Sequence, residues 1–158
     1  IVRHAKSSWD YEEISDIDRP LCTRGIKDAG TMAGRLKSRS QIPSLIISSP
    51  ACRALHTATI FTRVLKVPCE QMIIVEKFYQ GGMHEILDIL EKVDDQFSSV
   101  MIFGHNPDFT MLANHFLKHQ LDNVPTAGVV TLNFSSDKWK EIKKLKPESE
   151  YFDFPKKA

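Results

Sequence analysis

The sequence has few cysteines, no long apolar run and almost no net charge, and each shortage disfavours a class of protein. Its three cysteines, Cys22, Cys52 and Cys69, are odd in number and lack CxxC spacing, which argues against a disulfide framework or a zinc site and fits a reducing cytoplasm. No stretch is long enough to cross a bilayer, and none has the pattern of a signal peptide. The net charge of +1 gives no reason to expect nucleic acid or a membrane surface as a partner.

What is present suits one compact domain. A chain of 158 residues can bury a core without disulfides or metals, and 42% hydrophobic with 26% charged residues is ordinary for a globular protein. We therefore predict a single domain over residues 1–158. Because the chain has no initial Met and begins within an apolar strand, we expect a few residues of that domain to precede Ile1.

Short apolar runs alternate with amphipathic helical patterns along the chain. Strands are expected at 1–2, 44–48, 72–75, 99–104 and 129–134, with another near the sheet edge at 139–142. The charged run KEIKKLKPESE (140–150), which overlaps that last strand, is interpreted as a solvated edge and turn. Helices are expected at 23–38 with Thr23 as N-cap, after Ser49 as N-cap up to Leu65, at 83–93 and at 107–119. This alternation predicts a largely parallel sheet with helices on both faces.

Polar residues stand at the carboxyl ends of three of these strands. Arg3 and His4 end the first, SSP with Arg53 in the next helical turn follows the second, and His105 in GHNP follows the fourth. Ligands of open α/β sheets bind beyond these ends. Helix N-termini and the forked donors of arginine both suit the oxygens of a phosphoryl group. Each residue alone could be an ordinary surface or structural side chain, but one anion site explains all four.

The segments RHAKSSWD, DRPLCTRG, SSPACRALHTA, GHNP and PTAG follow one another in this order. Together they resemble the histidine phosphatase (phosphoglycerate mutase-like) superfamily, and most of all its SixA-type phosphohistidine phosphatase branch. The resemblance implies an α/β fold, a three-layer α/β/α sandwich around a mostly parallel mixed sheet with one antiparallel strand. It also implies that His4 is a nucleophile that is phosphorylated transiently, and that Arg3, Arg53 and His105 complete its phosphate pocket.

Two positions depart from the commoner pattern of the superfamily. Ala5 stands where Gly is more usual, as it does in the SixA-like branch. Asp10 stands where mutase-type relatives often have Asn, and because a carboxylate repels phosphate, that role is not transferred to it. Ser7 and Asn106 are further candidates for binding phosphate, as are Ser49 and Thr126, although turn and cap chemistry explains some of them equally well. Asp18 and Arg19 are expected to form a structural ion pair or to anchor the loop before the first helix.

The chemistry implied is attack on phosphorus by neutral His4, followed by hydrolysis of the phosphohistidine by water, with no metal and no other cofactor. Ester-cleaving relatives usually carry a Glu or Asp general acid after the third strand, where this chain has Gln80. Glu76 and Glu85 read as surface or helix residues. A site without an acid suits P–N cleavage better than P–O cleavage, because an alkoxide leaves poorly unless it is protonated.

The leading hypothesis is a cytoplasmic, metal-independent phosphohistidine phosphatase that acts in signal transduction on a phosphorylated protein of the histidine phosphotransfer or phosphocarrier type. A general small-molecule phosphomonoesterase and a phosphoglycerate or phosphosugar mutase of the same superfamily remain alternatives. A phosphoprotein-binding module without catalysis is disfavoured because His4 is present. A metal site at His4 and His105 lacks a carboxylate or thiol at ligand spacing.

Overall fold

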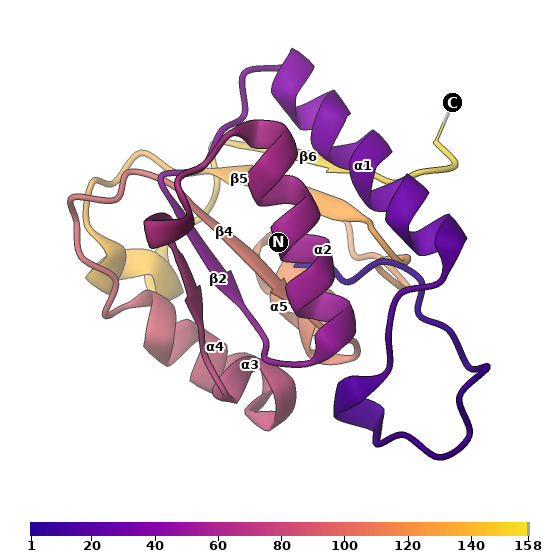
Figure 1. Cartoon of the computed structure of the whole chain (residues 1–158). Coiled ribbons are helices and arrows are strands. Elements are labelled where there is room, and N and C mark those ends of the chain that lie inside the picture. Colours follow the sequence, from indigo (N-terminus) through magenta and orange to yellow (C-terminus); the bar gives the residue numbers. More distant parts are fainter. Residues whose placement is uncertain (158) are drawn as a thin grey trace.

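One six-stranded mixed sheet organises the chain in the computed structural model, which describes residues 1–157 (Figure 1). Ala158, the last residue of the predicted domain, lies outside the described residues. The strand order is β3-β2-β4-β1-β5-β6. The strands are β1 (Val2–Arg3), β2 (Leu45–Ser48), β3 (Met72–Ile74), β4 (Val100–Gly104), β5 (Val129–Asn133) and β6 (Ser149–Asp153).

Only β5 runs against the other strands of this sheet. The pairs β1–β4, β2–β4 and β2–β3 are parallel, whereas β5 is antiparallel to both of its neighbours, β1 and β6. This confirms the expected mostly parallel sheet with one antiparallel strand. Parallel strands put their carboxyl ends on one edge of the sheet, so the segments that follow β1, β2 and β4 meet there.

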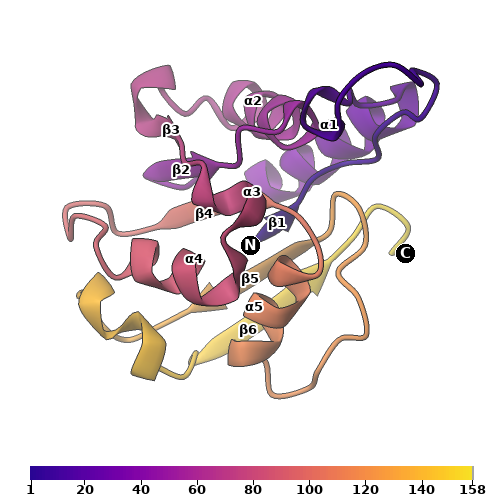
Figure 2. The same cartoon turned by 90° about the horizontal axis from the view of Figure 1, so that it is seen from below.

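Helices cover both faces of the sheet, as Figure 2 shows. On one face lie α1 (Thr23–Ser38) and α2 (Cys52–Leu65); on the other lie α3 (Lys77–Gln80), α4 (Gly82–Leu90) and α5 (Asp108–Phe116). Successive strand residues serve opposite layers: Ile46 packs in the cluster under α1 and α2, and Ile47 packs in the cluster under α4 and α5. Because both faces are buried, the strands can be apolar at consecutive positions. The three-layer α/β/α architecture is therefore confirmed.

The carboxyl-terminal part of the chain departs from the prediction. Residues 139–142, predicted as a strand, belong to a 3₁₀ helix, η3 (Trp139–Lys144). Trp139 and Ile142 are three residues apart, so one helical turn buries both against the α4 and α5 layer, and the Trp139 indole N–H donates to the carbonyl of Phe97 at 2.7 Å. The edge strand is instead β6, which was missed because most of its residues are exposed or only half-buried.

The N-caps of two helices differ from the predicted ones: that of α1 lies one residue earlier and that of α2 two residues later. Cys22 rather than Thr23 is the N-cap of α1, and Ala51 rather than Ser49 is the N-cap of α2. The Ser49 hydroxyl still accepts the N–H of Ala51 at 3.2 Å, so it closes the turn ahead of the helix. Ser49 is thereby free of helical geometry and lies at the end of β2.

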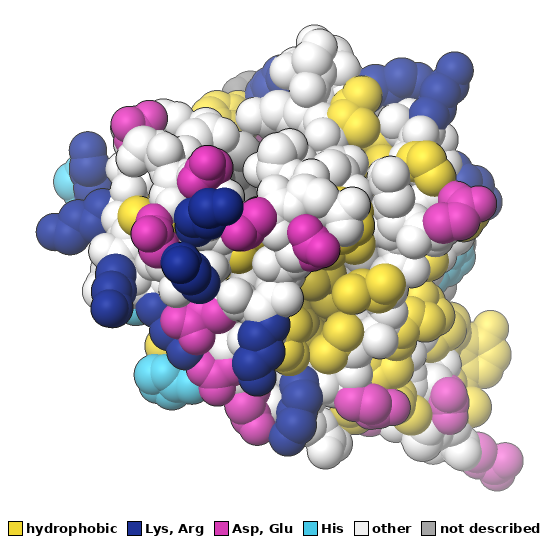
Figure 3. Space-filling model, turned by 90° about the vertical axis from the view of Figure 1, so that its left-hand side faces the viewer, with side chains coloured by type: hydrophobic (Ala, Val, Ile, Leu, Met, Phe, Trp, Pro, Cys, Tyr) yellow, Lys and Arg dark blue, Asp and Glu magenta, His cyan; other side chains and the backbone are white. Residues whose placement is uncertain are grey.

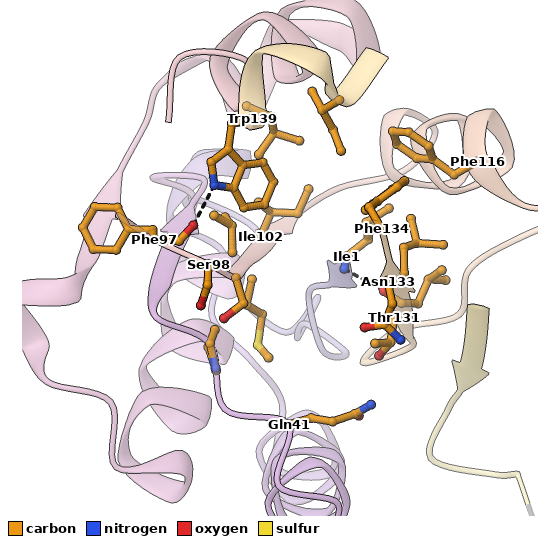
Figure 4. Close-up of a pocket in the computed structure, with 18 of the residues that line it drawn as sticks. Ile1, Gln41, Phe97, Ser98, Ile102, Phe116, Thr131, Asn133, Phe134 and Trp139 are labelled. Atoms are coloured by element: carbon orange, nitrogen blue, oxygen red, sulfur yellow. Dashed lines mark hydrogen bonds between the residues drawn. The ribbon is translucent and has the colours of Figure 1, made fainter. Parts of the chain in front are cut away.

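A large apolar hollow lies at the amino-terminal end of the sheet, between β4 and β5. Its volume is about 600 Å³, and ladder residues of the two strands line it together with η3 and the loop before β4 (Figure 4). β1, which separates these strands, has two residues, whereas each of its neighbours has five. Apolar side chains gather on this face of the molecule (Figure 3). Among the described residues, none of the helices is both long and apolar enough to span a membrane.

Candidate active site

A second, polar cavity lies at the opposite, carboxyl-terminal end of the sheet. Its volume is about 340 Å³. The residues that line it are Arg3, His4, Lys6, Ser7, Trp9, Arg19, Arg53, His105, Asn106 and Thr126. Of the eight candidates from the sequence, seven line this cavity, and Ser49 does not. Four of the lining side chains are basic and none is acidic, so the cavity suits an anion.

Pairing of β1 with β4 brings the two histidines together. Arg3 is paired with Gly104, so His4 and His105 follow side by side, with ring centroids 5.1 Å apart. The N–H of His4 donates to the carbonyl of Gly104 at 3.0 Å. Gly104 is required here, because a Cβ atom at this position would overlap the ring of Phe109 on α5. The end of β4 can therefore approach α5 closely, which fixes the start of the loop that carries His105.

His4 is held as a neutral imidazole with one free nitrogen. Its Nδ1 lies 2.7 Å from the carbonyl oxygen of Ala5, and because a carbonyl only accepts, Nδ1 carries the hydrogen. Nε2 then keeps its lone pair. Burial lowers the pKa of His4 to about 4, with Arg53, Arg3 and Arg19 adding to the effect, so the ring is neutral at pH 7. A neutral imidazole with an available nitrogen is a nucleophile.

His105 is anchored through Ser49. Its Nε2 lies 2.7 Å from the Ser49 hydroxyl oxygen. Because that oxygen accepts a hydrogen bond from the N–H of Ala51, the Ser49 O–H can donate a hydrogen bond to Nε2. His105 Nδ1 is then a donor, and it is buried without a partner among the described residues. Burial lowers the pKa of His105 to about 3, with His4 and Arg53 lowering it further. His105 therefore offers an N–H without carrying a charge.

The arginines are held by one part of the guanidinium and leave another part unpaired. Arg3 donates to the carbonyl of Val124 at 2.8 Å, and burial lowers its pKa. Arg53 donates to the backbone carbonyl of Asp16 and, at 2.9 Å, to its carboxylate. The Nε atoms of Arg3, Arg19 and Arg53 are buried without partners.

These unpaired donors are concentrated at one place. Among the described residues, the buried side-chain nitrogens that lack a hydrogen-bond partner all belong to residues that line this cavity. Buried donors are normally satisfied, and an unsatisfied one destabilises the fold by roughly 1–3 kcal/mol. Four of them around one cavity indicate a site built to bind an oxyanion.

Arg19 and Asp16 are the residues that sequence reasoning missed. Of the two expectations for Asp18 and Arg19, the ion pair between them is wrong, because Asp18 accepts from the Ser15 hydroxyl at 2.6 Å. Arg19 instead anchors the loop, since it pairs with Asp16 at 3.2 Å. The guanidinium of Arg19 also stacks on Trp9, with its carbon 3.6 Å from the ring centroid. Arg19 is thus another cation of the cavity. The only signal in the sequence was an arginine beside the start of a helix, which is too common to identify a site.

Asp16 bridges the cations from outside the cavity. Its carboxylate accepts from Arg53 and from the Tyr79 hydroxyl, each at 2.9 Å, and pairs with Arg19. Its partial burial raises its pKa, but the hydrogen bonds from Arg53 and Tyr79 outweigh that effect and hold the pKa below its usual value. Asp16 is therefore ionised at neutral pH and orients the two arginines.

Ser7 and Asn106, the two weaker candidates, differ in whether a hydrogen-bond donor remains available for a ligand. Ser7 accepts from Arg19 at 2.8 Å, so its own hydroxyl hydrogen can go to a ligand. The Asn106 amide N–H group donates to the Asn123 side chain at 2.6 Å and to the carbonyl of Val124 at 3.1 Å. The Val124 carbonyl also accepts from Arg3, so Asn106 stabilises the loop that positions Arg3.

Within residues 1–157, no three His, Cys, Asp or Glu side chains converge to form a metal site.

Comparisons of the sequence with known proteins agree with this geometry. Residues 1–78 match the model of the histidine phosphatase superfamily (branch 1). An uncharacterized protein of Mycobacterium tuberculosis is 30% identical over 112 residues, which is 71% of this chain and 67% of the relative. An uncharacterized chloroplastic protein of Arabidopsis thaliana is 30% identical over 149 residues, which is 89% of this chain and 68% of the relative.

Solved structures share the fold over nearly the whole chain. The SixA protein of Agrobacterium tumefaciens has a TM-score of 0.78 at 24% identity, covering 95% of this chain and 94% of its own. The protein histidine phosphatase SixA complexed with tungstate has a TM-score of 0.74 at 22% identity, covering 97% and 94%. A mycobacterial glucosyl-3-phosphoglycerate phosphatase has a TM-score of 0.59 at 14% identity, covering 96% and 95%. At these identities the likeness establishes the fold.

Proposed function

The chain belongs to the histidine phosphatase superfamily as a hydrolase, and we propose that it hydrolyses phosphohistidine on a protein through a transient phosphohistidine on His4. The observation that carries the proposal is the neutral His4 with a free Nε2, set among four buried N–H donors without partners. The nucleophile and the groups that would stabilise the transferred phosphoryl group thus share one cavity.

In the first step, His4 Nε2 forms a bond to phosphorus while the P–N bond of the substrate breaks. The leaving imidazole takes a proton from water or from the phosphate. Phosphorylation makes the His4 ring cationic, and its Nδ1–H bond to the carbonyl of Ala5, 2.7 Å long, stabilises that charge. The N–H groups of Arg3, Arg53 and His105 bind the phosphoryl oxygens, where charge accumulates in the transition state.

In the second step, water attacks the phosphorus of phosphorylated His4, the new P–N bond breaks, and inorganic phosphate leaves. His4 returns to its neutral form with its hydrogen still on Nδ1. The low pKa of His4, about 4, keeps the resting enzyme ready for the next attack. Because the guanidinium groups supply the positive charge, the proposal requires no metal and no other cofactor.

The acidic groups near the cavity support P–N over P–O cleavage. Asp16 is ionised and bound to Arg53 and Arg19, so it is a poor proton donor. Glu85 pairs with Lys77 at 3.0 Å, and Glu76 is exposed at the start of α3. An ester substrate needs an acidic side chain to protonate its alkoxide, whereas a leaving imidazole can take its proton from water or from the phosphate.

A phosphorylated protein is the substrate class we propose, of the histidine phosphotransfer or phosphocarrier type and so within cytoplasmic signal transduction. One solved neighbour is named a protein histidine phosphatase, and its bound tungstate is a tetrahedral oxyanion like phosphate. The three cysteines are free thiols, as is usual in a reducing compartment. The domain we propose spans residues 1–158.

A general phosphomonoesterase is the second candidate, because a neighbour with the same fold is named a glucosyl-3-phosphoglycerate phosphatase. A mutase is less well supported, since the Asp10 carboxylate is bound to the Ser8 hydroxyl at 2.8 Å and does not line the cavity.

The deciding experiment compares kcat/KM for a phosphohistidine protein, an aryl phosphate and 3-phosphoglycerate, with and without a chelator. We expect the phosphohistidine protein to be preferred by at least about tenfold, a difference of about 1.4 kcal/mol in activation free energy. Equal efficiency on the aryl phosphate favours the phosphomonoesterase, isomerisation of 3-phosphoglycerate favours the mutase, and inhibition by the chelator contradicts a metal-independent mechanism.

A further inference from the structure

The loop of residues 9–18, called the acidic loop below, is unusual in both its apolar and its charged side chains. It carries five carboxylates and no basic residue. It also carries three of the nine large apolar side chains that are exposed among the described residues: Trp9 at 76%, Tyr11 at 58% and Ile14 at 39%. Exposed aromatic side chains within a short segment are typical of protein-binding surfaces.

The acidic loop is fixed at its base and projects at its tip. At the base, Trp9 lies against Arg19, and Asp16 is bound by Arg53 and Tyr79. The tip, residues 11–14, is exposed and extends away from the body of the molecule (Figure 1). Trp9 lines the polar cavity, so the loop is continuous with the rim of the site. A protein that presents a phosphorylated side chain to the cavity would therefore lie beside this loop.

We propose that the acidic loop docks the substrate protein, and that this partner carries Lys or Arg and an apolar side chain beside its phosphohistidine. The inference rests on the proposed function and specifies its substrate. Tyr11 and Ile14 would pack on the apolar side chain, and Glu12 and Glu13 would attract the basic ones. Their negative charge also disfavours small polyanionic phosphates, so the loop acts on specificity as well as on affinity.

The test uses two phosphohistidine peptides, one flanked by Lys and Arg and the other by Asp and Glu, with free phosphohistidine as the small substrate. For the unmodified protein at low salt we expect kcat/KM to favour the basic peptide by about tenfold, and the preference to shrink as salt is added. The double variant Glu12→Lys/Glu13→Lys should abolish or reverse the preference. Tyr11→Ala should lower kcat/KM for the basic peptide about fivefold.

Two controls separate docking from catalysis. Hydrolysis of free phosphohistidine should stay within about twofold in all these variants, since none of the changed residues lines the cavity. Glu70→Lys and Ile73→Ala, exposed positions away from the loop, should leave the peptide preference intact. Equal kcat/KM on the two peptides overturns the docking surface but not the proposed function. Failure to hydrolyse any phosphohistidine substrate overturns both.

The apolar hollow between β4 and β5 supports a second, independent inference. Val2 is paired with Phe103 on one side and Val129 on the other, so Ile1 is level with Ile102 and Val130. A continuation of β1 by three residues ahead of Ile1, in the same register, would be level with Ser99 on one side and Asn133 on the other. Both of these residues line the hollow. β4 and β5 therefore diverge around a space with the path and width of a strand.

The amino group of Ile1 lies where a backbone amide of such a strand would lie. It donates to the carbonyl of Val130 at 2.8 Å, within the ladder that β1 makes with β5. Burial lowers the pKa of this amino group to about 5, because a charge there is partly removed from water. A neutral amide in the same position makes the hydrogen bond without that cost.

We infer that the hollow receives a three-residue extended segment that continues β1 ahead of Ile1, parallel to β4 and antiparallel to β5. Its backbone would pair with both strands, and its side chains would cover apolar residues such as Phe134 and Trp139, which line the hollow (Figure 4). The hollow is then a completed part of the core rather than a ligand site.

The test compares three chains: one beginning at Ile1, one with Val-Thr-Leu joined ahead of Ile1, and one with Gly-Ser-Gly there. Val-Thr-Leu should raise Tm by about 5 °C or more and reduce binding of a hydrophobic dye, because it completes the ladder and buries apolar surface. Gly-Ser-Gly, which removes the charge from Ile1 but packs poorly, should raise Tm much less. Equal Tm values for the two extended chains, or dye binding unchanged by Val-Thr-Leu, overturn the inference.

Discussion

The two hollows at opposite ends of the sheet differ in size and even more in chemistry. The hollow at the amino-terminal end is the larger, about 600 Å³ against about 340 Å³, and aromatic and aliphatic side chains such as Phe134, Ile142 and Trp139 line it. The smaller cavity at the carboxyl-terminal end has four basic side chains, two histidines and unpaired buried donors. Volume alone would select the apolar hollow, whereas the unsatisfied polar groups favour the smaller cavity as the proposed site.

Strand direction explains the difference. At this end of the sheet β4 begins and the antiparallel β5 ends, and they contribute ladder residues such as Val100 and Leu132, which belong to the apolar core, to the hollow. At their carboxyl ends β1 and β4 release the chain into loops whose first side chains are His4 and His105. Substitutions in the polar cavity should therefore change activity, and a substitution at the apolar end should change stability.

Removal of the nucleophile should have the largest effect. His4→Ala is expected to lower kcat by about 10⁴-fold or more, because no other group in the cavity can form the phosphorylated intermediate. Inorganic phosphate should still bind, as measured by calorimetry, since the donors of Arg53 and His105 remain. His119→Ala, at an exposed histidine, serves as the control. Turnover near that of the control would exclude His4 as the nucleophile.

Loss of a single guanidinium should come next. Arg53→Ala is expected to lower kcat/KM for phosphohistidine by about 10²- to 10³-fold, because one charged donor to the developing phosphoryl charge is removed. Steady-state kinetics beside Arg63→Ala, an exposed arginine of the same helix, gives the measurement and its control. A loss of less than about threefold would contradict contact between Arg53 and the phosphoryl group.

A substitution at the apolar end should affect stability alone. Ile142 is 4% exposed in the cluster beneath η3, so Ile142→Ala is expected to lower the unfolding free energy by about 2–5 kcal/mol. Denaturant titration measures this loss, and kcat measured at low temperature should stay within about twofold. A large change in kcat in a folded variant would mean that the two ends are coupled.

Acid should destabilise the polar end specifically. The pKa of folded His4 is about 4 and that of His105 about 3, below the value of about 6.5 for unfolded histidine. The unfolded chain therefore binds more protons, so the unfolding free energy is complete above pH 6.5 and decreases below it. Between pH 6.5 and 5 the expected slope is up to about 1.4 kcal/mol per pH unit for each histidine. An NMR titration of either ring with a midpoint near 6.5 would contradict this.

The smallest effect is expected at Ser7. Its hydroxyl is neutral and accepts from Arg19, so Ser7→Ala should lower kcat/KM only about three- to fivefold, as for one ordinary hydrogen bond. The matched control is Ser38→Ala, an exposed position at the end of α1. An effect as large as that of Arg53→Ala would mean that Ser7 acts directly in the chemistry.

The parts of the site that follow strands were predictable, and the part that depends on a loop was not. His4, Arg53 and His105 were expected together because three parallel strands end at one edge, a consequence of topology that apolar runs reveal. Arg19 reaches the same cavity only because the irregular acidic loop returns to it, and no periodicity specifies that path. Likewise η3 was mistaken for a strand, since Trp139 and Ile142 are buried by tertiary contacts that local pattern does not encode.

The unpaired donors around the cavity have a practical consequence for activity assays. Under the proposed function inorganic phosphate is the product, and it would accept from the same unpaired N–H groups of Arg3, Arg53 and His105 as the transferred phosphoryl group. Progress curves should therefore flatten as product accumulates, and buffers that contain phosphate or sulfate should slow turnover from the outset. In a cell, the concentration of free phosphate would then set how rapidly the enzyme works.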